Sequence, residues 1–224
     1  MDTSQSGPRA HHRGRTVRIN ERVCIIGTRM VSFYLYSDAG CTICFDSGSS
    51  VERAARGLAV VGLEPAQVSH VFLTHADSDH VGGVAAFDTA DVYLPQAEEA
   101  IASGVVPRRI FLFRLRGSFR HPYNILAEGE SIRVGSTTIR PIATPGHTPG
   151  STCYLINDEM LVTGDLLMLR RGRCRPMPRL LCNDPTENER SLRKLAQQVR
   201  SVNVLCTAHS GYTTDYEYAM TKYR

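Results

Sequence analysis

The chain has 224 residues, of which 42% are hydrophobic and 21% charged, with a formal net charge of +4. These values fit one sizeable globular domain or at most two small ones, and no apolar run reaches the ~18 residues of a membrane-spanning helix. A positive charge this modest does not by itself indicate a nucleic-acid partner.

The N-terminal residues 1–16 are rich in Ser, Gly, Arg and His and contain no apolar core of a secretory signal. We expect a disordered tail there, followed by a single domain over residues 17–224. The seven cysteines are odd in number and scattered, which predicts reduced thiols and a cytoplasmic location. Cys41 and Cys44 have CxxC spacing, but residues three apart in a strand face opposite sides, so we expect a structural role.

The first half of the chain predicts alternating strands and helices. Val17 to Phe45 is rich in Val, Ile, Tyr and Phe and predicts three strands in a meander. The elements expected next are a helix over 51–61, strand 68–74, a short helix over 81–87, strand 91–94 and helix 96–102. Residues 104–128 predict a loop or lid with some helix.

The second half continues the pattern. We expect two strands between Ser131 and Ala143, a hairpin over 151–156 and 160–163, an amphipathic helix over 186–199, strand 202–206 and a final helix over 213–223. The basic stretch 170–185 is predicted to be loop. Strands that alternate with helices in this way predict a layered α/β domain with mixed sheets.

One stretch, THADSDHVGG at residues 74–83, concentrates side chains that bind metals. It follows the apolar run Val71-Phe72-Leu73 and ends in two glycines. Within six residues it contains His75, Asp77, Asp79 and His80. Four such side chains cannot all enter an apolar core without a large desolvation cost, and convergence on a cation avoids that cost. The stretch therefore predicts a metal site at the end of a strand.

Three further turns place a His or Asp directly after a predicted strand. They contain His147 in TPGHTPG, Asp165 in TGD and His209 in AHSG. Sites in layered α/β domains usually assemble from such loops. Each residue alone has an ordinary alternative: a turn histidine, a capping aspartate or a buried hydrogen-bonded histidine. The set, in this order and in these turns, is far more specific than its members.

With these pieces and the turn that contains Asp46, the chain from Val17 to its end resembles the metallo-β-lactamase-fold superfamily. The resemblance implies an αββα four-layer sandwich with two mixed β-sheets and a dinuclear metal site, usually zinc. Carried over, the first metal would bind His75, Asp77 and His147, the second would bind Asp79, His80 and His209, and Asp165 would bridge them. The bridging Asp and the TPGHTPG turn are more similar to the glyoxalase II and lactonase side of the superfamily.

The chain departs from the family pattern HxHxDH, because Asp77 replaces the second His. Two divalent ions would bring four positive charges, and three carboxylates instead of two would face them. We therefore expect bound water to be acidified less, and Mn or Fe to gain on Zn. The flavodiiron branch also has a carboxylate here, a Glu. A third interpretation is that Asp77 leaves a single-metal or inactive protein.

The leading hypothesis is a metallo-hydrolase in which a hydroxide that bridges two divalent ions attacks an ester, thioester or lactone. Asp79 is the candidate catalytic residue, since it could steer the proton of the nucleophile. No GxSxG motif offers a serine nucleophile. Zinc is the first expectation for the metal, with Fe or Mn as alternatives because of Asp77.

Two arginine clusters, within 108–120 and 170–179, suggest an anionic small-molecule substrate, with the second cluster able to reach the rim of the site. A solvated basic surface is the equal alternative. The aromatic residues Phe111, Phe113, Phe119 and Tyr123 either wall a pocket or pack under the loop. We expect no membrane partner and regard nucleic acid as a lesser candidate. The pattern leaves the oligomeric state and the substrate open.

Three other functions compete with hydrolysis. A di-iron oxidoreductase-like protein is one, although the chain ends about 15 residues after His209 and leaves no room for a flavodoxin-like domain. A phosphodiesterase acting on nucleic acid is the second, motivated by the arginines. The third is a non-catalytic binding protein that has kept the fold.

Overall fold

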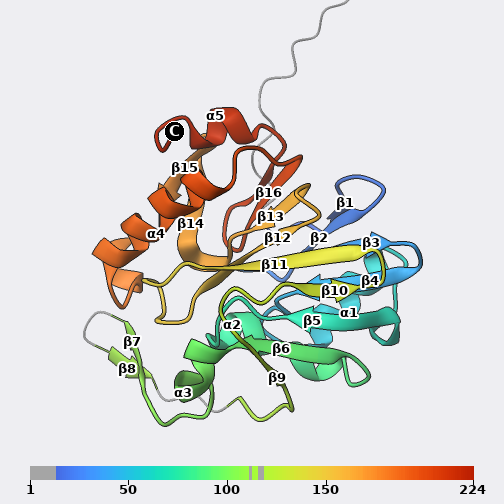
Figure 1. Ribbon diagram of the computed structural model, residues 1–224. Coiled ribbons are helices and arrows are strands. Elements are labelled where there is room, and N and C mark those ends of the chain that lie inside the picture. Colours follow the sequence, from blue (N-terminus) through green and yellow to red (C-terminus); the bar gives the residue numbers. More distant parts are fainter. Residues whose placement is uncertain (1–13, 111–112, 116–118) are drawn as a thin grey trace, which may run out of the picture.

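The computed structural model describes residues 14–110, 113–115 and 119–224. Two mixed β-sheets lie face to face, with helices on their outer faces (Figure 1). The predicted αββα sandwich is therefore confirmed. The predicted tail over residues 1–16 falls outside the described residues as far as residue 13, and the single domain over residues 17–224 stays a prediction.

The first sheet has the strand order β1-β2-β3-β4-β5-β6-β9. Its strands are antiparallel from β1 to β4 and parallel from β4 to β9. They are β1 (Val17–Arg18), β2 (Val23–Gly27), β3 (Ser32–Asp38), β4 (Cys41–Phe45), β5 (Val68–Phe72), β6 (Asp91–Pro95) and β9 (Asn124–Leu126). The parallel strand β5 is the one that leads into the 74–83 stretch, so that stretch starts from the middle of a buried sheet.

The second sheet has the order β10-β11-β12-β13-β16-β17, with only β13 and β16 parallel. Its strands are β10 (Ile132–Val134), β11 (Thr137–Ala143), β12 (Thr152–Ile156), β13 (Met160–Val162), β16 (Val204–Thr207) and β17 (Gly211–Thr213). The turns that contain His147, Asp165 and His209 all leave this sheet. The second sheet thus supplies the other side of the site.

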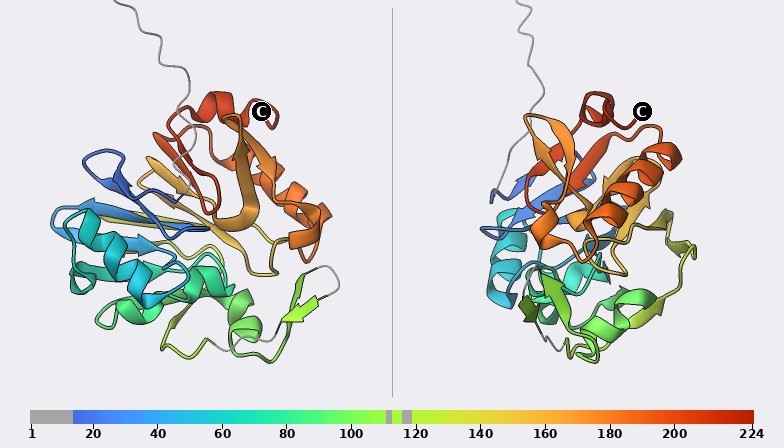
Figure 2. Two further views of the ribbon diagram at one scale, coloured as in Figure 1. Left: turned by 180° about the vertical axis from the view of Figure 1, so that it is seen from behind. Right: turned by 90° about the vertical axis from the view of Figure 1, so that its left-hand side faces the viewer.

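The helices cover the outer faces, α1 and α2 on the first sheet and α4 and α5 on the second (Figure 2). They are α1 (Val51–Val60), α2 (Ser78–Val81), α3 (Glu99–Ala102), α4 (Pro185–Gln198) and α5 (Tyr216–Met220), with short 3₁₀ turns at η1 (Pro65–Gln67), η2 (Val84–Ala86), η3 (Gln96–Glu98), η4 (Gly164–Leu166) and η5 (Arg179–Leu181). None of the helices within the described residues has the length and apolar character needed to span a membrane.

The core is divided into three clusters that match these layers. The central cluster combines residues of both sheets, such as Phe45 and Phe72 with Tyr154. An outer cluster packs the first sheet against α1, and another packs the second sheet against α4 and α5. Burial of apolar side chains on both faces of each sheet stabilises the sandwich and holds its edge rigid.

Five predictions were wrong in detail. Residues 17–45 form four strands, β1 to β4, where three were expected. The helix expected over 81–87 starts earlier, as α2 from Ser78, and 84–86 is only a 3₁₀ turn. The loops expected at 104–128 and 170–185 contain the hairpins β7 (Arg108–Ile110) to β8 (Phe113–Leu115) and β14 (Leu167–Arg170) to β15 (Arg173–Pro176), the latter beginning before residue 170. The last helix is shorter, because β17 occupies residues 211–213.

The two cysteines of the CxxC spacing face opposite sides of β4, as expected. Cys44 packs in the outer cluster, and Cys41 packs against the central one. Both are free, as are the other cysteines. Burial raises the pKa of Cys153 and of Cys174 to about 12, so these thiols stay protonated and inert at neutral pH.

Candidate metal centre

The 74–83 stretch changes direction sharply after β5. Thr74 and His75 continue from the strand, and Asp77 then takes the N-cap position of the four-residue helix α2. The helix turns Asp79 and His80 back toward His75, and the two imidazole rings lie 4.0 Å apart between centroids. Its backbone also passes close to the 46–50 loop, where a Cβ on Gly83 would lie 2.1 Å from a carbonyl oxygen. The glycines that close the motif therefore allow this tight packing.

The remaining side chains come from three turns of the second sheet. His147 lies between β11 and β12, Asp165 in η4 directly after β13, and His209 between β16 and β17. The first of these turns depends on Gly146, whose φ is +135° and where a Cβ would lie 2.2 Å from the backbone nitrogen of Asn188. Only glycine fits there, and α4 consequently holds the His147 turn in place.

The structure brings all seven predicted residues together. Three overlapping groups have ligand atoms within 4.8 Å of one another: His75, Asp77 and His147; Asp79, His80 and His209; and His75, His80 and Asp165. Asp165 lies centrally, with Oδ2 3.4 Å from His147 Nε2 and 3.1 Å from His209 Nε2, and Oδ1 3.5 Å from His80 Nε2. It is placed as a bridging ligand would be.

Hydrogen bonds behind two of the histidines fix which nitrogen faces inward. His80 Nδ1 donates to Asp46 Oδ2 at 2.8 Å, and His209 Nδ1 donates to the Met30 carbonyl at 2.9 Å. Each ring therefore turns Nε2 toward Asp165. In the neutral imidazole that nitrogen is a lone pair facing a carboxylate lone pair, an arrangement that becomes favourable when a proton on the nitrogen or a metal cation lies between them.

The buried atoms without partners test whether this donor set fits a metal. Within the described residues, His75 Nε2, His80 Nε2 and Asp165 Oδ1 are buried and have no hydrogen-bond partner. Unsatisfied buried polar atoms are rare and costly, and these three belong to residues of one group. The other buried atoms without a partner in the described part of the chain belong to His147, Asn188 and Tyr223. Ligand atoms around a tetrahedral metal with bonds of ~2.0–2.2 Å lie roughly 3.3–3.6 Å apart. Two of the separations around Asp165, 3.4 and 3.5 Å, lie within this range, and the third, 3.1 Å, is slightly shorter.

The charges in the cluster shift each other's titration. Burial alone would raise the pKa of Asp165, but the charges of His80 and His147 hold that pKa well below its usual range. Burial would likewise lower the pKa of His80, but Asp46 and Asp165 raise it well above normal. For Asp77, burial is outweighed by the hydrogen bond with His147 and by the His75 and Arg108 charges, so its pKa is also low. The cluster thus keeps its carboxylates ionised and demands positive charge.

Two positioning residues hold the ligand loops. Asp46 Oδ1 accepts from the Thr74 backbone N–H at 2.7 Å, in addition to orienting His80 through Oδ2. Asp46 was part of a turn that carried the family resemblance. The fully buried Glu98 was missed, because nothing in the segment PQAEEA marks it. Its carboxylate accepts from the N–H groups of Ala76 at 2.9 Å and Gly150 at 2.8 Å, and so it joins the two loops that flank Asp77 and His147.

The sequence placed Arg108 in a basic cluster, but the structure places it inside the centre. Arg108 is buried, and its Nε lies 2.8 Å from Asp77 Oδ1.

The second arginine cluster, within 170–179, lies elsewhere. Arg170, Arg171, Arg173 and Arg175 line a cavity formed by β14 and β15 that includes none of the seven residues. The expectation that this cluster reaches the rim of the site receives no support.

A cavity of about 670 Å³ opens beside the centre. Asp77, Asp79 and Arg108 of the centre line this cavity. Its lining also includes the apolar residues Val84, Ile101 and Phe119 together with Arg120 and His121. Of the two roles predicted for the aromatic residues, walling a pocket or packing under the loop, Phe119 has the first. Tyr123 stacks on Phe119 with ring centroids 5.5 Å apart. Phe111 and the side chain of Phe113 lie outside the described residues.

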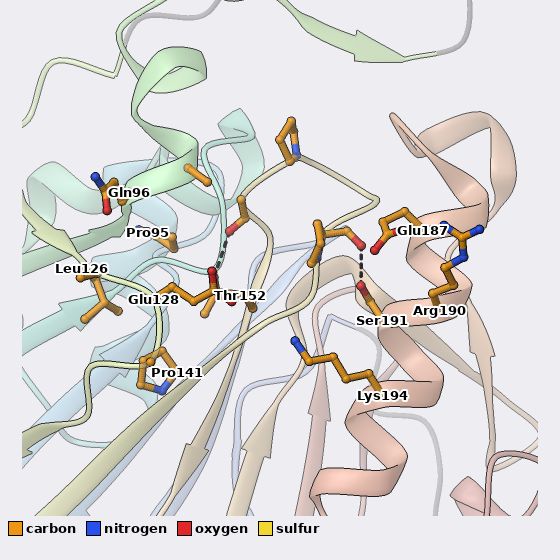
Figure 3. A pocket seen from close by; sticks show the side chains of 17 residues that line it. Pro95, Gln96, Leu126, Glu128, Pro141, Thr152, Glu187, Arg190, Ser191 and Lys194 are labelled. Atoms are coloured by element: carbon orange, nitrogen blue, oxygen red, sulfur yellow. Dashed lines mark hydrogen bonds and ion pairs between the residues drawn. The ribbon is translucent and has the colours of Figure 1, made fainter.

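A second cavity, of about 420 Å³, lies on the other side of the His147 turn (Figure 3). Pro145 and Gly150 of that turn form one wall, and Glu187, Arg190 and Lys194 of α4 form the other. Ser191 of α4 donates to the Pro145 carbonyl at 2.7 Å across this region. None of the seven residues lines this cavity, so it is separate from the chemistry.

Comparisons with known proteins agree with this geometry. The family model described as the metallo-beta-lactamase superfamily matches residues 26–209. The chain is 29% identical over 141 residues, 61% of its length, to "Probable metallo-hydrolase YqgX" of Bacillus subtilis, and 28% identical over 191 residues, 84% of its length, to hydroxyacylglutathione hydrolase of Salmonella typhi. The matches span 65% and 64% of those relatives, less than two thirds of either.

A solved structure shows the same fold. A metallo-beta-lactamase family protein of Thermus thermophilus aligns with a TM-score of 0.68 at 23% identity, covering 92% of this chain and 79% of that one. At this identity the likeness speaks for the fold alone.

Proposed function

Because the chain belongs to the metallo-beta-lactamase superfamily, we propose that it is a metal-dependent hydrolase that cleaves an ester, thioester or lactone-type bond in a small molecule. One observation carries the proposal: buried, unpartnered nitrogen and oxygen atoms of His75, His80 and Asp165 converge beside a cavity. The match to a hydroxyacylglutathione hydrolase over 84% of the chain supports the thioester as one substrate class.

The first metal would be held by His75, Asp77 and His147, and the second by Asp79, His80 and His209. Asp165 would be shared between them. Two divalent ions there would supply Lewis acidity and lower the pKa of water toward neutrality. Zinc is the ion we propose, since imidazole and carboxylate ligands at tetrahedral spacing suit it.

Asp79 is the residue we propose as catalytic. Its side chain is 39% exposed, the most open of the seven, and it lines the cavity. Asp79 Oδ2 lies 3.6 Å from His209 Nε2, which keeps one end of the carboxylate directed at the centre. Its solvent-facing position suits it to accept and pass on the proton of an attacking water.

The cavity wall supports a substrate with an apolar body and an anionic group. Val84, Ile101 and Phe119 offer apolar contact, while the exposed Arg120 adds a positive charge on the same wall. We expect Arg120→Ala to raise KM roughly tenfold for anionic esters, the loss of one charge-assisted contact, and to leave neutral esters unchanged. Arg109→Ala is the control, because Arg109 is exposed and is absent from the cavity lining.

The hydrolase proposal is tested by elemental analysis of the purified protein together with a panel of thioester, lactone, β-lactam and phosphodiester substrates. We expect bound divalent metal and turnover of at least one carbonyl substrate, lost on chelation and restored by metal. A protein without bound metal, and without activity after addition of Zn²⁺, Mn²⁺ or Fe²⁺, would contradict the proposal. Turnover of the phosphodiester alone would favour the nuclease-like alternative.

A further inference from the structure

Arg108 is an unusual residue for a metal centre, because a cation normally avoids the place where another cation binds. It starts β7 and its side chain is 4% exposed. Its Nε donates to Asp77 Oδ1 at 2.8 Å and to Oδ2 at 3.1 Å, Nη2 donates to the Leu181 carbonyl at 2.9 Å, and Nη1 donates to Asn183 Oδ1. An arginine keeps its charge in proteins, and burying it unpaired would cost several kcal/mol. The buried guanidinium therefore pairs its positive charge with the Asp77 carboxylate.

The two oxygens of Asp77 have different tasks. Oδ1 makes the shorter contact with Arg108. Oδ2 faces the ligand nitrogens, 3.1 Å from His147 Nε2 and 3.5 Å from His75 Nε2. The longer separation lies within the spacing of ligand atoms around a tetrahedral ion, about 3.3–3.6 Å, and the shorter one is slightly below it. Oδ1 is thus held and neutralised by Arg108, while Oδ2, which accepts a longer hydrogen bond from the same Nε, keeps a second lone pair directed at the ligand nitrogens.

Charge counting shows what this arrangement achieves. Asp77 stands where the family pattern has a neutral histidine, and so it removes one unit of positive charge from the centre. Arg108 returns one unit at 2.8 Å from the same carboxylate. The centre with both residues has the net charge of the usual histidine pattern.

We propose that Asp77 and Arg108 together replace the missing histidine, with Asp77 supplying the ligand atom and Arg108 supplying the compensating charge that keeps the first position suited to zinc. This inference rests on the metal centre of the proposed function. It also reverses the expectation from the sequence, in which Asp77 alone shifted the preference toward Mn or Fe.

A rival arrangement uses the same contacts. Arg108 Nη2 lies 3.1 Å from His147 Nε2. That nitrogen has one lone pair, so it cannot accept a hydrogen bond from Arg108 and bind a metal at once. In the rival, Arg108 takes the place of the first metal and the chain binds a single ion. The number of metals bound per chain separates the two.

The test compares the wild type with Asp77→His, Arg108→Met and the double variant, each stripped of metal and titrated with Zn²⁺ or Mn²⁺ in competition with a chelating dye. We expect two Zn²⁺ per wild-type chain. Asp77→His leaves Arg108 facing a cation without its partner, so the first-position affinity falls by roughly 10- to 100-fold. Arg108→Met raises the preference for Mn²⁺ over Zn²⁺ by about tenfold. The double variant regains wild-type zinc affinity.

The recovery of zinc affinity in the double variant is the decisive result, because two independent losses of affinity would multiply. The pairing would be overturned if the fold-losses in zinc affinity of the two single variants multiplied in the double variant. It would also be overturned if the wild type bound one Zn²⁺ and Arg108→Met bound two. Thermal unfolding of each metal-free variant accompanies the titration, and recovery of the unfolding temperature in the double variant also counts as rescue. Arg109→Met, an exposed neighbour, is the matched control and keeps wild-type affinities. If the wild type bound no metal, the proposed function itself would be contradicted.

Discussion

The two positions of the proposed metal centre are built in opposite ways. The first, with His75, Asp77 and His147, is enclosed: these side chains are 1%, 15% and 4% exposed, with Arg108 and Glu98 behind them. The second is open, since Asp79 is 39% and His209 18% exposed. Charges supplied by the protein therefore surround the first position, whereas two of the three ligands of the second position are accessible to solvent.

This contrast assigns different work to similar residues. Asp77 and Asp79 are two residues apart and both are carboxylates, yet one is held by a buried guanidinium and the other faces solvent. A buried, paired carboxylate cannot exchange protons readily, whereas an exposed one can. From this difference we propose Asp77 as a structural ligand and Asp79 as the chemically active residue.

The largest effect is expected where the two positions meet. Asp165→Ala removes the carboxylate that contacts His80, His147 and His209. We expect both metals to be lost and hydrolysis to fall to background, measured by elemental analysis and by the substrate panel. Retention of two metals would show that the positions do not depend on a shared ligand.

Asp79→Asn is expected to separate the positions. The first should keep its ion, because its ligand group of His75, Asp77 and His147 does not include Asp79, while kcat falls about 10²- to 10⁴-fold through loss of a proton acceptor. Metal count and kcat measured on the same preparation check this. Equal loss of both ions would contradict the division of roles.

Chelation should expose the contrast without any substitution. Addition of excess chelator to the loaded protein should remove metal in two phases, the faster from the second position, where His209 and Asp79 are reachable from solvent. Release can be followed with a coloured chelator. A single phase would mean that the two positions are equally accessible.

The smallest effect is expected from Glu98→Gln. Gln keeps the shape, but its single carbonyl oxygen can accept from only one of the N–H groups of Ala76 and Gly150, and its NH2 group then faces the other donor. We expect a loss of about 1–3 kcal/mol in the free energy of unfolding, with weaker metal binding confined to the first position. Denaturant unfolding and the metal titration measure the two effects. An equal loss of metal affinity at the second position would contradict the expected difference between the two positions.

The misread segments have a common cause. In β14 and β15 the buried side chains are Leu167, Leu169 and Cys174. They alternate with more exposed ones, which are Met168 and Arg170 in β14 and Arg173 and Arg175 in β15. The alternation of a half-buried hairpin was present, but the arginines and prolines made the stretch resemble a loop. Arg108 was hidden for the same reason, as one arginine among several.

The sequence by itself determined the seven candidate ligands and the fold family. Each of these His and Asp residues alone has an ordinary alternative, but their order in small-residue turns after apolar strands carries the family resemblance, and that resemblance implies the ligand set. Only the tertiary structure decided how Asp77 is compensated. Arg108 is 31 residues away and Glu98 lies 22 residues from the loop nitrogen it accepts from. The role of such a buried charge depends on which partners the packed core brings within about 3 Å of it, and spacing along the chain does not encode that.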